Sequence, residues 1–196
     1  MQSPIWTDEL SAEQREEDSP RFVARPLEEV TARIRRFTHP ATRLLLSGDG
    51  LTTTLLRAWT GADVTVLRAA QHRVPAAETP WGAGKLLGTD GAEAIVRHSV
   101  LGGADGADLS RNAVVARPDL CPAARHCLED TSAPLGPMLQ AAGTAYRRSL
   151  LDAGRRPWGP CGQPAAYKAY LLWHGERPFA AVFELFNPAV VPADAR

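Results

Sequence analysis

The sequence has few lysines and no excess of charge of either sign. Lys85 and Lys168 are the only lysines, and the 22 Lys and Arg residues balance the 22 Asp and Glu residues. A chain without net positive charge lacks the electrostatic surface of a general nucleic-acid binder or of a membrane-surface protein. We therefore expect neither nucleic acid nor a membrane as a partner.

Cysteine is also scarce, and long apolar runs are missing. Cys121, Cys127 and Cys161 do not have the spacing of zinc ligands, and we expect free thiols in a reducing compartment. No apolar run approaches the ~20 residues that a membrane helix needs. The first residues are acidic and polar, unlike a secretory signal. These absences predict a cytoplasmic protein with no metal site.

What the sequence does contain is enough for one domain. Its 196 residues are 44% hydrophobic, which suffices to bury a core of ordinary size. Charged residues crowd the stretch from Glu13 to Asp18, so residues 1–25 are expected to form a flexible leader. The single domain is then expected to cover residues 26–196.

The periodicity of the apolar residues predicts both helices and strands. Helices are expected from Pro26 to about Phe37, from Leu51 to Trp59, over 119–128 and over 138–150. Alternating residues predict strands over 63–74, 93–101, 109–117, 166–173 and 179–186. The Gly-rich segment 81–91 is expected to be a loop or flap. Two hairpins without crossover helices favour an α+β fold, with an antiparallel sheet and helices packed on it.

Two charged residues stand out on apolar strand faces. Arg97 shares one face of its strand with Ile95, Ser99 and Leu101, and Glu184 is the only charge on its own strand face. A lone buried charge is costly unless something compensates it. Either the two residues pair as a structural salt bridge, or both line a cavity in which the arginine holds a carboxylate. Neighbouring His98 is expected to be a packed or surface histidine rather than a base.

Four blocks of the sequence together resemble the chorismate pyruvate-lyase family. They are Leu45–Thr52 (LLSGDGLT), Ile95–Leu101 (IVRHSVL) with its returning strand Leu109–Val115, Ala133–Leu139 (APLGPML), and Phe183–Pro188 (FELFNP). The blocks occur in the order that the family shows. The resemblance implies an antiparallel sheet of about six strands, with packed helices and an internal ligand cavity under flaps.

The resemblance also implies an activity and a site. It implies a lyase, free of cofactors, that eliminates pyruvate from chorismate to leave 4-hydroxybenzoate. The catalytic positions are Arg97, which would grip the ring carboxylate, and Glu184, which would donate a proton to the departing ether oxygen. The implied substrate-binding positions are Leu51, Thr52, Leu135 and Gly136, and Arg111 is a candidate for the second carboxylate. The implied partner is a small carboxylate, and we expect a monomer or a weak homodimer.

Two alternatives remain open at this point. Segment 81–91 has no counterpart in the family, so the cavity could serve a lyase or cyclase acting on another cyclic acid in a specialised bacterial pathway. A related fold is also the effector domain of bacterial transcription regulators, which makes a non-catalytic small-acid binding domain the second alternative. The sequence ahead of residue 26 is short and acidic for a DNA-binding helix-turn-helix, which disfavours such a regulator.

Overall fold

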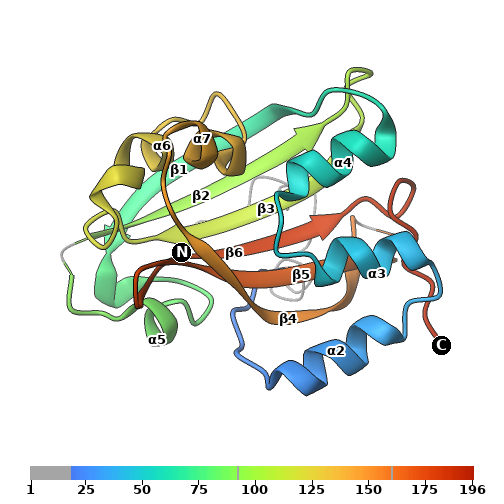
Figure 1. The fold of residues 1–196 in the computed structure, drawn as a ribbon, viewed down its shortest axis with the longest axis horizontal. Coiled ribbons are helices and arrows are strands. Elements are labelled where there is room, and N and C mark those ends of the chain that lie inside the picture. The colour runs from blue at the N-terminus through green and yellow to red at the C-terminus, as the bar shows by residue number, and fades with distance from the viewer. Residues whose placement is uncertain (1–18, 92, 160) are drawn as a thin grey trace.

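The protein folds around one antiparallel sheet of six strands (Figure 1). The computed structural model describes residues 19–91, 93–159 and 161–196. The strands are β1 (Thr65–Pro75), β2 (Glu93–Gly102), β3 (Asp108–Ala116), β4 (Arg147–Trp158), β5 (Gln163–His174) and β6 (Arg177–Phe186). Their order in the sheet is β1-β2-β3-β6-β5-β4, and all neighbours are antiparallel. The predicted α+β class is therefore confirmed.

Short helices cover the sheet. They are α2 (Leu27–Arg35), α3 (Pro40–Ser47), α4 (Thr52–Thr60), α5 (Gly84–Leu87), α6 (Arg125–Glu129) and α7 (Leu135–Ala141), with 3-10 turns η1 (Ala76–Glu78) and η2 (Pro122–Ala124). One sheet face carries α6, α7, α4 and α3, with α2 beside the edge strand β4 (Figure 1). The opposite face packs against α5 and Phe22.

Residues 19–25 belong to the packed part of the molecule, although the sequence places them in the leader. Phe22 is buried against the sheet, and its backbone N–H donates to the carbonyl of Trp81 at 2.9 Å. The N–H of Arg25 donates to the carbonyl of Leu151 on the edge strand β4 at 3.0 Å. The remainder of the predicted leader, residues 1–18, lies outside the described residues.

Most predicted elements form, and one is wrong. Helix α4 ends where predicted, because Gly61 adopts the left-handed φ of 68° that a helix C-cap requires. The helix predicted over 138–150 instead ends at Ala141, and strand β4 begins at Arg147. Gly143, with a φ of 65°, redirects the chain between them. The strand was hidden because the spacing of Tyr146 and Leu150 continues the helical period of α7.

Two further expectations concern membrane-spanning segments and the cysteine thiols. Among the residues that the structure describes, no helix has the length and apolar character needed to span a membrane. None of the three cysteines forms a disulfide, and Cys121 and Cys127 are buried among the core residues under α6.

His98 generates a pH-dependent prediction. Burial and the neighbouring His72 lower its pKa from 6.5 to about 4. Between these values the unfolded chain binds a proton that the folded chain does not, so stability is full above pH ~6.5 and is lost as the pH falls toward ~4. We expect the free energy of unfolding to drop by up to about 3 kcal/mol across this window. Denaturant unfolding at a series of pH values measures it.

The matched control is His174, an exposed histidine at the end of β5. His98→Gln should flatten the pH profile between pH 4 and 6.5, whereas His174→Gln should leave the wild-type slope. An unchanged slope in folded His98→Gln protein would show that other groups cause the acid sensitivity.

Candidate functional site

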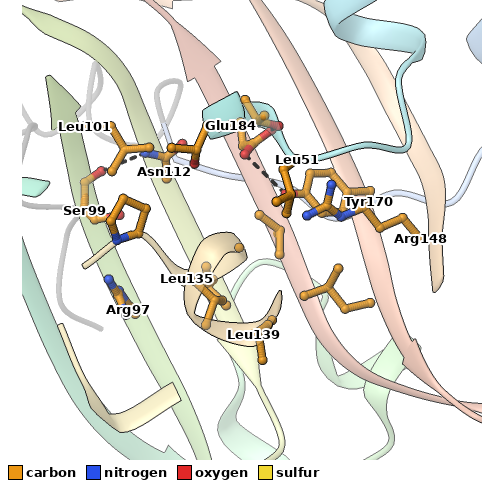
Figure 2. Close-up of a pocket in the computed structure, with 17 residues that line it drawn as sticks. Leu51, Arg97, Ser99, Leu101, Asn112, Leu135, Leu139, Arg148, Tyr170 and Glu184 are labelled. Carbon is orange, nitrogen blue, oxygen red and sulfur yellow. Dashed lines mark hydrogen bonds between the residues drawn. The ribbon is translucent and has the colours of Figure 1, made fainter. Parts of the chain in front are cut away.

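A closed pocket lies between the sheet and the starts of helices α4 and α7 (Figure 2). Its walls come from β2, β3, β5 and β6, and its cover consists of residues 51–53, 134–136 and Leu139. The cavity volume is about 50 Å³. Ligand-binding cavities commonly measure ~300–1,000 Å³. The cavity as it stands is therefore smaller than the cavities that commonly hold a ring-sized ligand.

The strand register places polar residues in a row across the pocket wall. Ser99 on β2 is opposite Asn112 on β3, Asn112 is opposite Glu184 on β6, and Glu184 is opposite Lys168 on β5. All four are buried. Because residues directly opposite each other on neighbouring strands point to the same face, these four side chains lie on one side of the sheet, and Ser99, Asn112 and Glu184 line the pocket. Four strands that are distant in sequence thus build one polar surface.

The next row is charged at one end and aromatic at the other. Arg97 is opposite Val114, Val114 is opposite Val182, and Val182 is opposite Tyr170. The two valines form an apolar floor between the guanidinium and the phenol. The pocket therefore has one apolar strip flanked by groups that can hold charge and hydrogen bonds.

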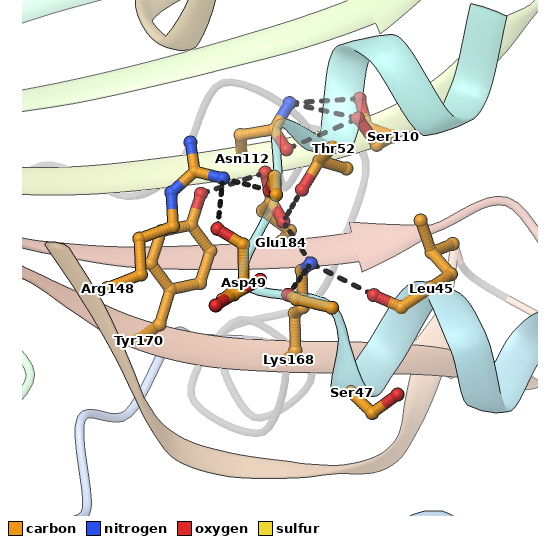
Figure 3. A network of polar contacts seen from close by, with 12 residues as sticks. Leu45, Ser47, Asp49, Thr52, Ser110, Asn112, Arg148, Lys168, Tyr170 and Glu184 are labelled. Carbon is orange, nitrogen blue, oxygen red and sulfur yellow. Dashed lines mark hydrogen bonds and ion pairs between the residues drawn. The ribbon is translucent and has the colours of Figure 1, made fainter. Parts of the chain in front are cut away.

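Glu184 is the centre of a hydrogen-bond network (Figure 3). Its Oε2 atom accepts from the Thr52 hydroxyl at 2.7 Å, and its Oε1 atom accepts from the Tyr170 hydroxyl at 3.2 Å. The Nζ atom of Lys168 lies 3.7 Å from Oε2. Thr52 is the first residue of α4, where backbone N–H groups also favour a negative charge. The carboxylate is thus held as a hydrogen-bond acceptor.

Lys168 connects this network to the segment before α4. Its Nζ atom donates to the carbonyls of Leu45 at 3.0 Å and Gly48 at 3.4 Å. Desolvation lowers the pKa of Lys168, and the carboxylate of Glu184 opposes that shift. Desolvation, together with Glu184, raises the pKa of Tyr170, which keeps the phenol protonated as a donor. The network is therefore a buried ion pair whose remaining donors and acceptors are satisfied by its neighbours.

Arg97 donates its hydrogen bonds to the segment before the cover and not to Glu184. Its Nη1 donates to the carbonyl of Asp130 at 2.6 Å, and its Nη2 donates to the carbonyl of Ala133 at 3.0 Å. Desolvation lowers the pKa of this guanidinium. Only 3% of Arg97 is exposed, and no carboxylate of the described residues lies within 4.0 Å of it. A buried positive charge therefore lines the pocket without an ion-pair partner among the described residues, and Asp130 opposes the shift of its pKa from a longer distance.

Arg148 on β4 supplies a second positive charge at the other side of the pocket. Its Nη1 donates to the carbonyls of Asp49 and Gly50, and its guanidinium lies 5.3 Å from the ring centre of Tyr170. It also lies close to Gly136, where an added Cβ atom would come within 3.6 Å of Nη2. No acidic side chain among the described residues forms an ion pair with it.

The structure brings together most residues that the sequence singles out. Arg97 and Glu184 both line the pocket, as do the four cover residues Leu51, Thr52, Leu135 and Gly136. Arg97 and Glu184 do not form the salt bridge that was one of the two readings, because Glu184 pairs with Lys168 instead.

Arg111 lies elsewhere. It sits one residue before Asn112 on β3, so its side chain points to the opposite face of the sheet, where its guanidinium lies 4.1 Å from the ring centre of Trp158. It also lies 3.9 Å from Asp108. The candidate contact between Arg111 and a second carboxylate in this pocket is therefore excluded by the strand's alternation.

Several pocket residues were missed. Lys168 is the odd charge in the apolar strand β5, so the criterion that selects Glu184 also selects Lys168. Asn112 and Tyr170 follow from the register once the strands are paired. Arg148 could not be placed, because its segment was predicted to be a helix.

Comparison with known proteins identifies the fold. No family model matches this sequence, and no curated protein matches it. PhnF from Mycobacterium smegmatis superposes with a TM-score of 0.57 at 16% identity, over 74% of this chain and 66% of that one. A structure assigned to the GntR family of transcriptional regulators gives 0.52 at 14%, over 88% and 69%. YydK from Bacillus subtilis, described as a possible transcriptional regulator, gives 0.51 at 15%, over 74% and 65%.

These similarities show that the chain shares the fold of those structures, and they correct the predicted activity. The similar structures are described as transcriptional regulators, not as enzymes, so the prediction of a carbon–oxygen lyase that acts on chorismate is wrong. In the site, both carboxyl oxygens of Glu184 are engaged by residues of the protein itself, Thr52 and Tyr170, with Lys168 beside them. The expected absence of a nucleic-acid partner gains no support from such neighbours.

The buried pair of Lys168 and Glu184 generates a prediction on stability. Lys168→Met and Glu184→Gln each leave one buried charge uncompensated and should each lower the free energy of unfolding by about 3–5 kcal/mol. The double variant should cost less than the sum, with a coupling of about 1–3 kcal/mol. Denaturant unfolding of the four proteins gives the coupling.

The matched control is the exposed pair of Arg73 and Glu93, whose Nη1 and Oε2 atoms are 3.2 Å apart. Arg73→Met and Glu93→Gln should show a coupling below about 1 kcal/mol. Strictly additive effects at Lys168 and Glu184 would refute the view that they act as a unit.

Proposed function

We propose that this chain is a non-catalytic binding domain for a small organic acid, held in the pocket under α4 and α7. The observation that carries the proposal is the pair of guanidinium groups, Arg97 and Arg148, at the pocket, with no carboxylate of the described residues within 4.0 Å of either. Lys168 and Glu184 neutralise each other, so the pocket as a whole is positive. A buried positive charge is stabilised by an anion, and arginine binds carboxylates with paired hydrogen bonds.

The rest of the wall suits an acid with an apolar body. The floor of Val114 and Val182 and the cover residue Leu139 offer apolar contact between the two arginines. Glu184 and Asn112 offer hydrogen-bond acceptors beside this floor. A cyclic acid that carries a hydroxyl group would satisfy all three features, with its carboxylate toward Arg97.

Arg97 also links ligand binding to a possible change in the conformation of the segment before α7. It holds the carbonyls of Asp130 and Ala133, which precede the cover residues at the start of α7. A carboxylate that takes over these donors would release the segment before α7, and the cavity would enlarge. Such a movement would suit a domain that changes conformation when a ligand binds, as the description of its structural neighbours as transcriptional regulators suggests.

The direct test is calorimetric titration with 4-hydroxybenzoate, benzoate and the neutral benzamide. The two acids should bind, the hydroxylated acid more tightly, and the amide should bind at least about tenfold more weakly because it cannot pair with the guanidinium groups. Arg97→Met should weaken acid binding by about 10–100-fold, since a hydrogen bond to a charged group contributes about 1.5–3 kcal/mol.

The matched control is Arg111→Met, which removes a partly buried arginine from the opposite face of the same sheet. It should bind the acids like the wild type. Folded Arg97→Met protein that binds equally well would overturn the assignment, and so would equal binding of acid and amide.

A further inference from the structure

A second hollow, which we call the outer hollow, adjoins the pocket at the start of β4. Its volume is about 610 Å³, and its lining comes from the segment before α4, the end of α7 and the start of β4. Leu51 and Arg148 line this hollow, and the same two residues line the pocket. Their side chains therefore stand between the two spaces, and we call them the partition.

The partition consists of side chains and not of paired backbone. A Cβ atom added at Gly136 would lie 2.9 Å from Cδ2 of Leu51 and 3.6 Å from Nη2 of Arg148, so both side chains reach the start of α7. Figure 2 shows Leu51 and Arg148 on one side of the pocket and Arg97 on the other. Among the described residues, no backbone hydrogen bond joins residues 49–53 to residues 133–137. The partition can therefore open by side-chain rotation, without the loss of a helix or a strand.

Arg148 holds the partition in place. Its Nη1 donates to the carbonyls of Asp49 and Gly50, the two residues that directly precede Leu51. Its Nη2 donates to the hydroxyl of Tyr146 at 3.4 Å. The guanidinium thus ties the edge strand β4 to the backbone that carries Leu51. Without these bonds, the segment before α4 would keep Leu51 against Gly136 less firmly.

We propose that the outer hollow is the entrance to the pocket, and that Leu51, held by Arg148, is its gate. The pocket measures about 50 Å³, so a ring-sized molecule needs an opening in its wall. The partition is a part of that wall which side chains close, next to a space that is large enough for such a molecule. The inference rests on the proposed function only for the kind of molecule admitted, a small organic acid.

The experiment measures how fast a small neutral reagent reaches the pocket. Cys161→Ser removes the exposed cysteine, and Val182→Cys places a thiol on the pocket floor. This parent protein is treated with methyl methanethiosulfonate, and mass spectrometry of its peptides follows each thiol. Leu51→Ala removes the gate and Arg148→Met removes its tie, so each should raise the modification rate at position 182 at least about tenfold.

Filling the outer hollow should have the opposite effect. Gln140 is an exposed residue of α7 that lines the hollow. Gln140→Trp should therefore lower the modification rate at position 182 at least about threefold. The matched control is Gln163→Trp, the same substitution at the exposed start of β5, outside the lining of the hollow. It should leave the rate unchanged.

The two buried cysteines separate the gate from general loosening of the fold. Cys121 and Cys127 lie in the core under α6 and should stay unmodified in every variant. If they react as fast as the thiol at position 182, the opening is global and the gate is refuted. Unchanged rates in Leu51→Ala and Arg148→Met, or equal slowing by the two tryptophans, would also overturn the proposal.

Benzoate distinguishes a failure of the gate from a failure of the proposed function. Benzoate bound in the pocket should protect the thiol at position 182 in the parent protein, and the neutral benzamide should protect it less. If the gate variants respond as expected but benzoate gives no protection, the gate stands and the binding of acids in this pocket is refuted. If benzoate protects but the gate variants do not respond, only the gate fails.

Discussion

The fold depends on one buried carboxylate. Glu184 accepts hydrogen bonds from Thr52 at the start of α4 and from Tyr170 on the neighbouring strand, and it pairs with Lys168. Lys168 in turn holds the carbonyl of Leu45 at the end of α3. Without these partners, the desolvation of the charge would cost several kcal/mol. The contacts that compensate the buried charge of Glu184 therefore also hold helices α3 and α4 against the sheet.

Because Glu184 pairs with Lys168, the two arginines of the pocket form their hydrogen bonds elsewhere. Neither Arg97 nor Arg148 forms an ion pair with an acid of the described residues, and Asp130 acts on Arg97 only from a longer distance. Both donate to backbone carbonyls of the segments that precede the cover, Arg97 to Asp130 and Arg148 to Asp49. A carbonyl carries only a partial charge, so a carboxylate competes well for the same donors. In the binding function proposed above, a carboxylate would therefore replace these carbonyls as the acceptor.

The sequence predicts the sheet well and the site in part, for reasons that particular residues make clear. Strands β2, β5 and β6 are found because apolar residues continue along them to clear turns, such as Gly175 with its φ of 55°. Arg97 and Glu184 are found because each is a lone charge on an apolar face. Their partners are not found, because partnership depends on the strand register. The activity inferred from the matching blocks fails because these blocks predict the fold, and structures that share this fold are described as transcriptional regulators.

Strand β4 was missed because of its place in the sheet. It is an edge strand, and edge strands carry charged residues because an apolar edge would pair with other chains. Its arginines, including Arg148, Arg155 and Arg156, obscure the alternation by which a strand is recognised. The bulge between Leu150 and Asp152 then turns Asp152 to the face opposite Arg148. One edge strand therefore sends a cation to the pocket and a buried acid to the opposite face of the sheet, where Arg25 and Arg33 pair with it.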